Sequence, residues 1–404
     1  MQPELAHPDI DQLAGDAHSA VAQTGWPSSK HEAWKFTPLD KSGFDSLAPA
    51  SRPADTLSTA QTQSLTFKDG YLVSAGTMDK AISLRQLGRD DVTLLNWLKL
   101  LPKDHHLSYL SLGGLGEAVL LEVEASENEI PPLTLHFTGE QASASAHPVV
   151  LVQMADGARL TLIEEHVGSN ALSAPVLMAD VGASASLHVA KYQDQAHSTS
   201  HLGLSVLKLG EQAKINGFTL SKGSKLARME SHVEFMAEDA ELVLSAIYLG
   251  ASGQHHDITT VVQHEVPNCQ SNQVIRGVLN DDAHGVFQGK VRVAPDAQKT
   301  DGQQMSRALL LSRDAVADAK PELEIFADDV VCAHGATVGE LDETLLFYLK
   351  SRGIPKAQAQ AMLIKAFLGD ALEQIDDDAI ASFMNQIIDD WAEQNNDALA
   401  MGNS

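Results

Sequence analysis

Cys332 and His334 are the residues whose type and spacing most directly suggest metal binding. One residue separates them in a segment rich in strand-forming residues, so their side chains point to the same strand face, roughly 6.6 to 7 Å apart along the backbone. Two ligands cannot complete a tetrahedral or cluster site, so a metal here would need ligands from elsewhere in the chain or from a second subunit. A buried thiol beside a surface histidine fits the same pattern.

Common catalytic motifs are missing. The run from Gly285 to Val291 resembles a phosphate-binding loop, but it has one residue too few between its glycines, and Val291 replaces the metal-binding hydroxyl. The cluster at Gly113, Gly114 and Gly116 lacks the third glycine of a dinucleotide-binding fingerprint. Neither a G-x-S-x-G elbow nor an H-E-x-x-H helix occurs. These observations disfavour ATPase, dehydrogenase and hydrolase activities.

Composition narrows the class of protein further. The 404 residues include 54 acidic side chains against 28 Lys and Arg, a formal charge of -26, which disfavours nucleic acid and anionic membranes as partners. Two cysteines exclude a disulfide framework and a four-thiolate metal site within one chain, and they suit a reducing compartment. The start of the chain lacks a signal-peptide pattern and no apolar run is long enough for a membrane helix, so we expect a cytoplasmic protein.

Three regions follow one another along the chain. Residues 1–117 are expected to be mostly helical, with an aromatic arm whose Trp34 and Phe36 dock onto the rest of the protein. Residues 118–339 consist of short alternating runs of Val, Leu, Ile and Thr separated by turn residues, which is typical of strands. The turns recur at Ala158, Ala183, Ala213, Ala240 and Ala283. This recurrence without intervening helices favours a β-solenoid, and its irregular spacing leaves a β-sandwich as the alternative.

Residues 340–404 are predicted to be helical again. A first helix covers 343–350, with Gly353 placed to end it and Pro355 to begin the next. The last helix carries one complete apolar stripe, formed by Ile380, Phe383, Met384, Ile387, Ile388 and Trp391. Such a stripe packs either against the protein's own body or against a partner.

Several segments together resemble the SufB/SufD family of the SUF iron-sulfur cluster assembly machinery. They are 272–293, 296–301, 309–312, 320–339 and 346–355, and the segment 34–37 resembles the family's N-terminal region. The resemblance implies a mainly β fold, a right-handed parallel β-helix between helical ends. It also implies a complex in which a SufB-like subunit pairs through the β-helices and a SufC-like ATPase binds near the C-terminal helices.

The resemblance also implies a site. His334 lies in a His-Gly-Ala-Thr motif and is expected to contribute to a nascent iron-sulfur cluster or iron site shared with the SufB-like subunit, while Cys332 is the weaker candidate. Ile380, Phe383, Met384, Ile387 and Trp391 are expected in the ATPase-docking region. Whether the assembled complex binds a flavin stays open, and a homodimer of the isolated chain is compatible with the same surfaces.

The sequence therefore predicts a non-catalytic scaffold subunit for iron-sulfur cluster assembly. A carbohydrate-active β-helix enzyme is one alternative, but its carboxylates would have to share a groove, and the adjacent pairs 281–282 and 328–329 should face opposite sides of a strand. A stand-alone metal-binding protein is another. The histidine pairs 105–106 and 255–256 give it little support, because adjacent strand residues rarely chelate together.

Overall fold

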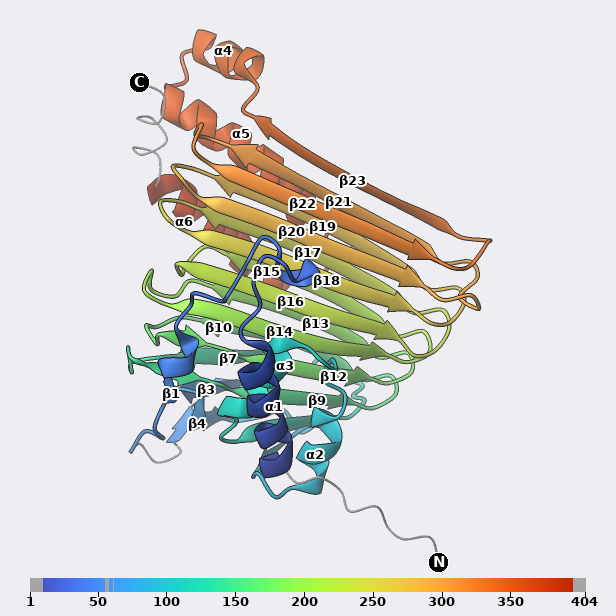
Figure 1. Ribbon diagram of the computed structural model, residues 1–404. Helices are drawn as coiled ribbons and strands as arrows, with labels where there is room; N and C mark the ends of the chain where they lie inside the picture. The colour runs from blue at the N-terminus through green and yellow to red at the C-terminus, as the bar shows by residue number, and fades with distance from the viewer. Residues whose placement is uncertain (1–9, 55–57, 61, 395–404) are drawn as a thin grey trace, which may run out of the picture.

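The computed structural model describes residues 10–54, 58–60 and 62–394, in which the chain winds into a β-solenoid with helices at both ends (Figure 1). Two long sheets form its walls. Sheet A contains β1 (Ala48–Pro49), β5 (Ile82–Leu87), β6 (Ala118–Val123), β8 (Ala144–Ala146), β9 (Val149–Met154), β11 (Leu172–Ser173), β12 (Val176–Val181), β14 (Ser200–Leu209), β16 (Leu226–Phe235), β18 (His255–His264), β20 (His284–Val293) and β22 (Val316–Ile325). Sheet B contains β2 (Ser58–Ala60), β3 (Ser64–Lys68), β4 (Tyr71–Gly76), β7 (Leu133–Thr138), β10 (Arg159–His166), β13 (Ser186–Gln193), β15 (Lys214–Ser221), β17 (Glu241–Gly250), β19 (Gln270–Leu279), β21 (Asp301–Leu310) and β23 (Val331–Glu340). The predicted mainly β fold between helical ends is confirmed, and its right-handed sense stays a prediction.

Each later coil adds one parallel strand to each sheet without a shift of register. In sheet A, for example, Leu226 pairs with His255 and His255 pairs with His284. Equivalent positions of successive coils therefore lie next to one another, and their side chains form ladders along the solenoid. The ladder of Leu160, Leu187, Ile215 and Leu242 in sheet B is almost fully buried and belongs to the apolar core between the sheets.

The turn before each strand of sheet B explains the recurring alanines. Ala158, Ala185, Ala213 and Ala240 are fully buried, and each of their carbonyls accepts a hydrogen bond from the backbone of the next coil. Cys269 occupies the next position of this ladder, and its carbonyl accepts from the backbone N–H of Asp301.

Two of the predicted turn positions differ from this ladder. The stacked alanine of the second turn is Ala185 rather than Ala183, because Ser184 takes the left-handed conformation, with φ of 55°. Ala283 precedes β20 in sheet A and belongs to the other wall, so the longest gap in the series came from combining turns of two sheets. The smaller unevenness came from Ala183 standing in place of Ala185.

The N-terminal region combines strands with helices. Its helices are α1 (Ile10–Thr24), α2 (Val92–Leu98) and α3 (His106–Gly114), with 3-10 turns at Glu32–Trp34 and Phe44–Ser46. It is less helical than expected, because β3 extends sheet B beside β7 and β5 extends sheet A antiparallel to β6. These strands pair with backbone groups at the first edge of the solenoid.

An arm around Trp34 crosses the outer face of sheet A. Trp34 is buried, and the Arg228 guanidinium lies 4.1 Å from its ring centroid. Thr37 donates a hydrogen bond to Asp257, and Lys320 forms a 2.6 Å ion pair with Glu32. The predicted docking of the arm through Trp34 is confirmed, whereas Phe36 is only partly buried.

The C-terminal region contains α4 (Glu343–Ser351), α5 (Lys356–Leu372) and α6 (Asp378–Gln394). Asp342 caps α4 by accepting hydrogen bonds from the backbone of Thr344 and Leu345, and Gly353 follows the helix with φ of 87°. Figure 1 shows α5 and α6 behind the strands, on the side away from α1 and α3, and α4 beyond the last strands. None of the helices in the described ranges has the length and apolarity that crossing a membrane requires.

Candidate metal centre

Cys332 and His334 lie on β23, which ends sheet B. The strand pairs with β21, placing Cys332 beside Gly302 and His334 beside Gln304. Cys332 continues the inward ladder that begins with Leu160, while His334 continues the neighbouring ladder that begins with Leu162. Both side chains therefore belong to the inner face of the wall, as their spacing of two predicts.

The end of the coil leaves this pair accessible. His334 is exposed and Cys332 is partly buried, although equivalent residues of the inner coils are almost fully buried. Cys332 packs against the apolar core, and burial raises the pKa of its thiol, while the backbone N–H of Gly302 opposes this and the Asp301 charge adds to it. The free thiol is thus held in its protonated form, and a metal binding there must displace a proton.

The interior becomes polar as it approaches His334. Leu162 and Val189 occupy this ladder in earlier coils, and Gln273 and Gln304 replace them beside the open end. Both atoms of the Gln304 amide are buried without a hydrogen-bond partner among the described residues, and so is Nε2 of Gln273. Leaving buried amides of this kind without partners costs about 1 to 3 kcal/mol each.

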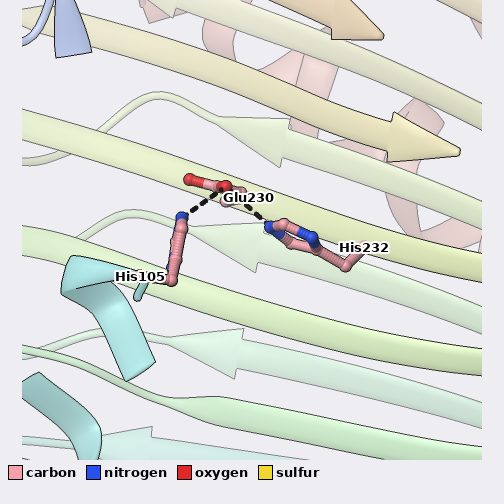
Figure 2. Close-up of side chains that lie close together, drawn as sticks. All are labelled: His105, Glu230 and His232. Atoms are coloured by element: carbon pink, nitrogen blue, oxygen red, sulfur yellow. Dashed lines mark hydrogen bonds and ion pairs between the residues drawn. The ribbon is translucent and has the colours of Figure 1, made fainter. Parts of the chain in front are cut away.

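At this end of the solenoid, the described part of the chain supplies two metal-binding side chains, those of Cys332 and His334. Its only group of three or more potential metal ligands lies elsewhere, at His105, Glu230 and His232 on the outer face of sheet A (Figure 2). Treating His105 as a strand residue beside His106 misses this cluster, because its members come together only where the segment before α3 folds back over β16.

The predicted stripe on α6 covers the outer face of sheet B. Ile380, Met384 and Ile388 are fully buried, in one cluster with Phe218 and Ile247 of the sheet. The remaining stripe residues, which are partly buried against the same cluster, are Phe383, Ile387 and Trp391. Within this chain the stripe therefore attaches α6 to the solenoid.

Exposed apolar side chains occur instead on α4. Leu345, Phe347 and Tyr348 are 50%, 72% and 53% exposed, and none of the residues of this helix is buried. Below the helix, a hollow lined in part by Leu311, Phe347 and Lys350 separates it from the end of the solenoid. The helix thus presents an apolar surface that the described chain leaves uncovered.

A carbohydrate-active enzyme would need the adjacent aspartates for catalysis, but Asp281, Asp282 and Asp329 stabilise turns. Asp281 accepts a hydrogen bond from the Ser252 hydroxyl, Asp282 accepts one from the Gly253 backbone, and Asp329 forms an ion pair with Lys299. These contacts join neighbouring coils, so the carboxylates of Asp281, Asp282 and Asp329 have structural partners.

Comparison with known proteins identifies the family. A family model described as the SufBD core domain of SUF system FeS cluster assembly matches residues 136–367. The chain belongs to the SufB/SufD family. The match includes the whole Cys332–His334 segment and confirms the resemblance expected from the sequence.

Relatives extend this similarity beyond the core domain. The chain is 32% identical over 377 residues to "Iron-sulfur cluster assembly protein SufD" of Escherichia coli (strain K12), covering 89% of this chain and 88% of the relative. It is 28% identical over 357 residues to an iron-sulfur cluster assembly SufBD family protein of Mycobacterium tuberculosis, covering 86% and 85%. A SufD of Bacillus subtilis is 33% identical over 143 residues, covering 35% and 33%.

Proposed function

We propose that this chain is a non-catalytic scaffold subunit on which iron-sulfur clusters are assembled, acting with a SufB-like subunit and a SufC-like ATPase. The observation that carries the proposal is the incomplete pair of metal ligands, Cys332 and His334, at the uncovered end of a SufB/SufD-family solenoid. The nascent cluster or iron is the cargo of this site. A site completed only across a subunit boundary would be open, as release of a cluster requires.

The SufB-like subunit pairs with the last coil in this proposal. β22 and β23 end their sheets, and exposed strand edges readily pair with another chain. Apolar side chains are also unusually exposed near this end, at Val316, Phe326, Val331 and Val338. In the absence of that partner, the same edges would support a homodimer of the isolated chain.

His334 is the principal ligand from this subunit. Its imidazole is exposed, whereas the Cys332 thiol packs against the core and must lose a proton before it binds metal. Further ligands come from the SufB-like partner. Both cysteines of the chain are free thiols, as expected in the reducing environment of the cytoplasm, where we place the protein.

The ATPase docks on the C-terminal helices. The stripe of Ile380, Phe383, Met384, Ile387 and Trp391 holds α6 on sheet B, and the exposed side chains of α4 supply contact area for the partner. The stripe residues therefore serve docking by positioning the helical region. ATP hydrolysis belongs to the partner.

Co-purification tests the assignment. The tagged chain, expressed with its untagged SufB-like and SufC-like partners, should recover both. Truncation after Gly339 should lose the ATPase and retain the SufB-like subunit, although it also uncovers the apolar face of sheet B.

A triple substitution on α4 tests the same contact while α6 still covers the apolar face of sheet B. Replacing Leu345, Phe347 and Tyr348 with serine should lower ATPase recovery. Val92→Ser is the control outside the C-terminal helices, since Val92 is 64% exposed on α2. Full ATPase recovery by the triple variant would show that α4 does not contribute to the docking surface. Recovery of neither partner by the wild-type chain would refute the scaffold assignment.

A further inference from the structure

His105, Glu230 and His232 bring three metal-binding atoms together at a second place on the molecule. Nε2 of His105 lies 2.9 Å from Oε1 of Glu230, and Nε2 of His232 lies 2.8 Å from the same oxygen. All three ligand atoms fall within 4.8 Å of one another. Figure 2 shows both imidazoles directed at the carboxylate, His105 from the segment before α3 and the other two residues from β16.

The local fold explains this convergence. Glu230 and His232 are two residues apart on β16, so they share its outer face. His105 precedes α3 in extended conformation and makes no capping hydrogen bond with its side chain, which is free to face the sheet. The imidazoles of His105 and His232 pack edge to face, with centroids 5.2 Å apart, and the ring of Trp34 lies 6.4 Å from His105.

Charge in this region favours a bound cation. Oε2 of Glu230 accepts hydrogen bonds from Nε and Nη2 of Arg228 at 3.0 and 2.7 Å, and Asp257 accepts another from Nη1 at 2.7 Å. Two carboxylates thus surround one guanidinium, leaving one negative charge facing the imidazoles.

The imidazole of His105 has nitrogen atoms without hydrogen-bond partners in the part of the chain that the structure describes. Nδ1 of His105 is buried without a hydrogen-bond partner in the described structure, and its Nε2 contacts the carboxylate without hydrogen-bond geometry. The His105 and His232 side chains keep 13% and 15% of their surface exposed, so an ion can reach the cluster from solvent.

We infer that His105, Glu230 and His232 form a binding site for a divalent first-row transition metal ion. Two imidazoles and one carboxylate suit zinc or ferrous iron and leave coordination positions for water. All three ligands belong to one chain, so this site is complete without a partner and is separate from the one at His334. A metal here would tie the segment before α3 to sheet A beneath the Trp34 arm.

Metal titration of the full-length chain tests the site. The protein is stripped with EDTA, desalted and titrated with Co²⁺, followed by visible absorption, and with Zn²⁺ in competition with a chromophoric chelator. The wild-type chain should bind one ion tightly and unfold at a higher temperature in its presence. His105→Ala and His232→Ala should each weaken binding at least tenfold, on the order of the loss caused by removing even an outer-shell partner.

Two controls separate this site from other donors. His136 and Glu165 form a pair of similar spacing, 2.6 Å, that belongs to no three-donor group in the described residues, so His136→Ala should bind like wild type. His334→Ala should also keep this ion, whether or not the cluster proposal holds. Circular dichroism without metal checks folding, and His232→Ala is the decisive variant because His232 lies at the accessible rim. Absence of wild-type binding, or equal affinity in folded His232→Ala, would overturn the inference.

Discussion

Acid should destabilise this protein in part through His147, which lies between β8 and β9. The side chain is 6% exposed, Nδ1 has no hydrogen-bond partner within the described ranges, and the ring lies against Gly114 of α3. Burial alone lowers the pKa of its imidazole from 6.5 to about 4. The folded state therefore requires the neutral ring, which the unfolded chain protonates readily below its own pKa.

The sign and size of the effect follow from proton linkage. The contribution of neutral His147 is fully present above pH 6.5 and is lost as the pH falls from 6.5 through about 4. With these two pKa values, the free energy of unfolding falls by about 2 kcal/mol at about pH 5 relative to about pH 8, and by about 3 kcal/mol below pH 4.

Urea unfolding of wild type and His147→Leu, compared at several pH values, measures this contribution. The difference in unfolding free energy between the two proteins should move by about 2 kcal/mol in favour of the variant between about pH 8 and pH 5. His136→Leu is a control of opposite sign: the hydrogen bond to Glu165 raises the pKa of His136, so its contribution is present below pH 6.5 and lost as the pH rises. Parallel profiles for wild type and His147→Leu would refute the reasoning.

Three further predictions concern the arm, the turn ladder and nucleotide binding. Trp34→Ala should lower the free energy of unfolding by roughly 3 to 5 kcal/mol and make the arm sensitive to protease, whereas equal protease resistance would contradict the arm's docking. Cys269→Ala should cost less than about 1.5 kcal/mol in urea unfolding and leave the iron content of the complex unchanged, because alanine fills the same ladder position in earlier coils. Calorimetry of the isolated chain with MgATP should detect no tight binding, since the sequence lacks a phosphate loop, and sub-micromolar affinity would contradict the scaffold assignment.

Local patterns predicted the repeated elements well. The period of two in runs such as 159–163 and 241–247 places successive side chains inside and outside a wall, and both runs lie in strands of sheet B. The same small turn residues serve both sheets, so the sequence could not assign Ala283 to the opposite wall. The irregular spacing therefore left a sandwich open until the parallel register was known.

The burial and the neighbours of the candidate site residues depend on the tertiary structure. Strand periodicity predicted that Cys332 and His334 share a face, but only the register shows that this face continues the interior of the last coil. Helical periodicity likewise identified the α6 stripe without revealing that sheet B covers it. The cluster of His105 with β16 depends on the course of the arm and α3, which no local pattern encodes.

The most direct test of the central proposal is the iron and sulfide content of reconstituted complexes. Wild-type, His334→Ala and Cys332→Ser chains are purified with the SufB-like and SufC-like partners and reconstituted anaerobically. Because His334 is exposed at the end of the solenoid, its replacement should leave folding and complex formation intact while sharply lowering iron and sulfide, and Cys332→Ser should lower them less. Iron and sulfide equal to wild type in an intact His334→Ala complex would contradict a role for His334 in the cluster site.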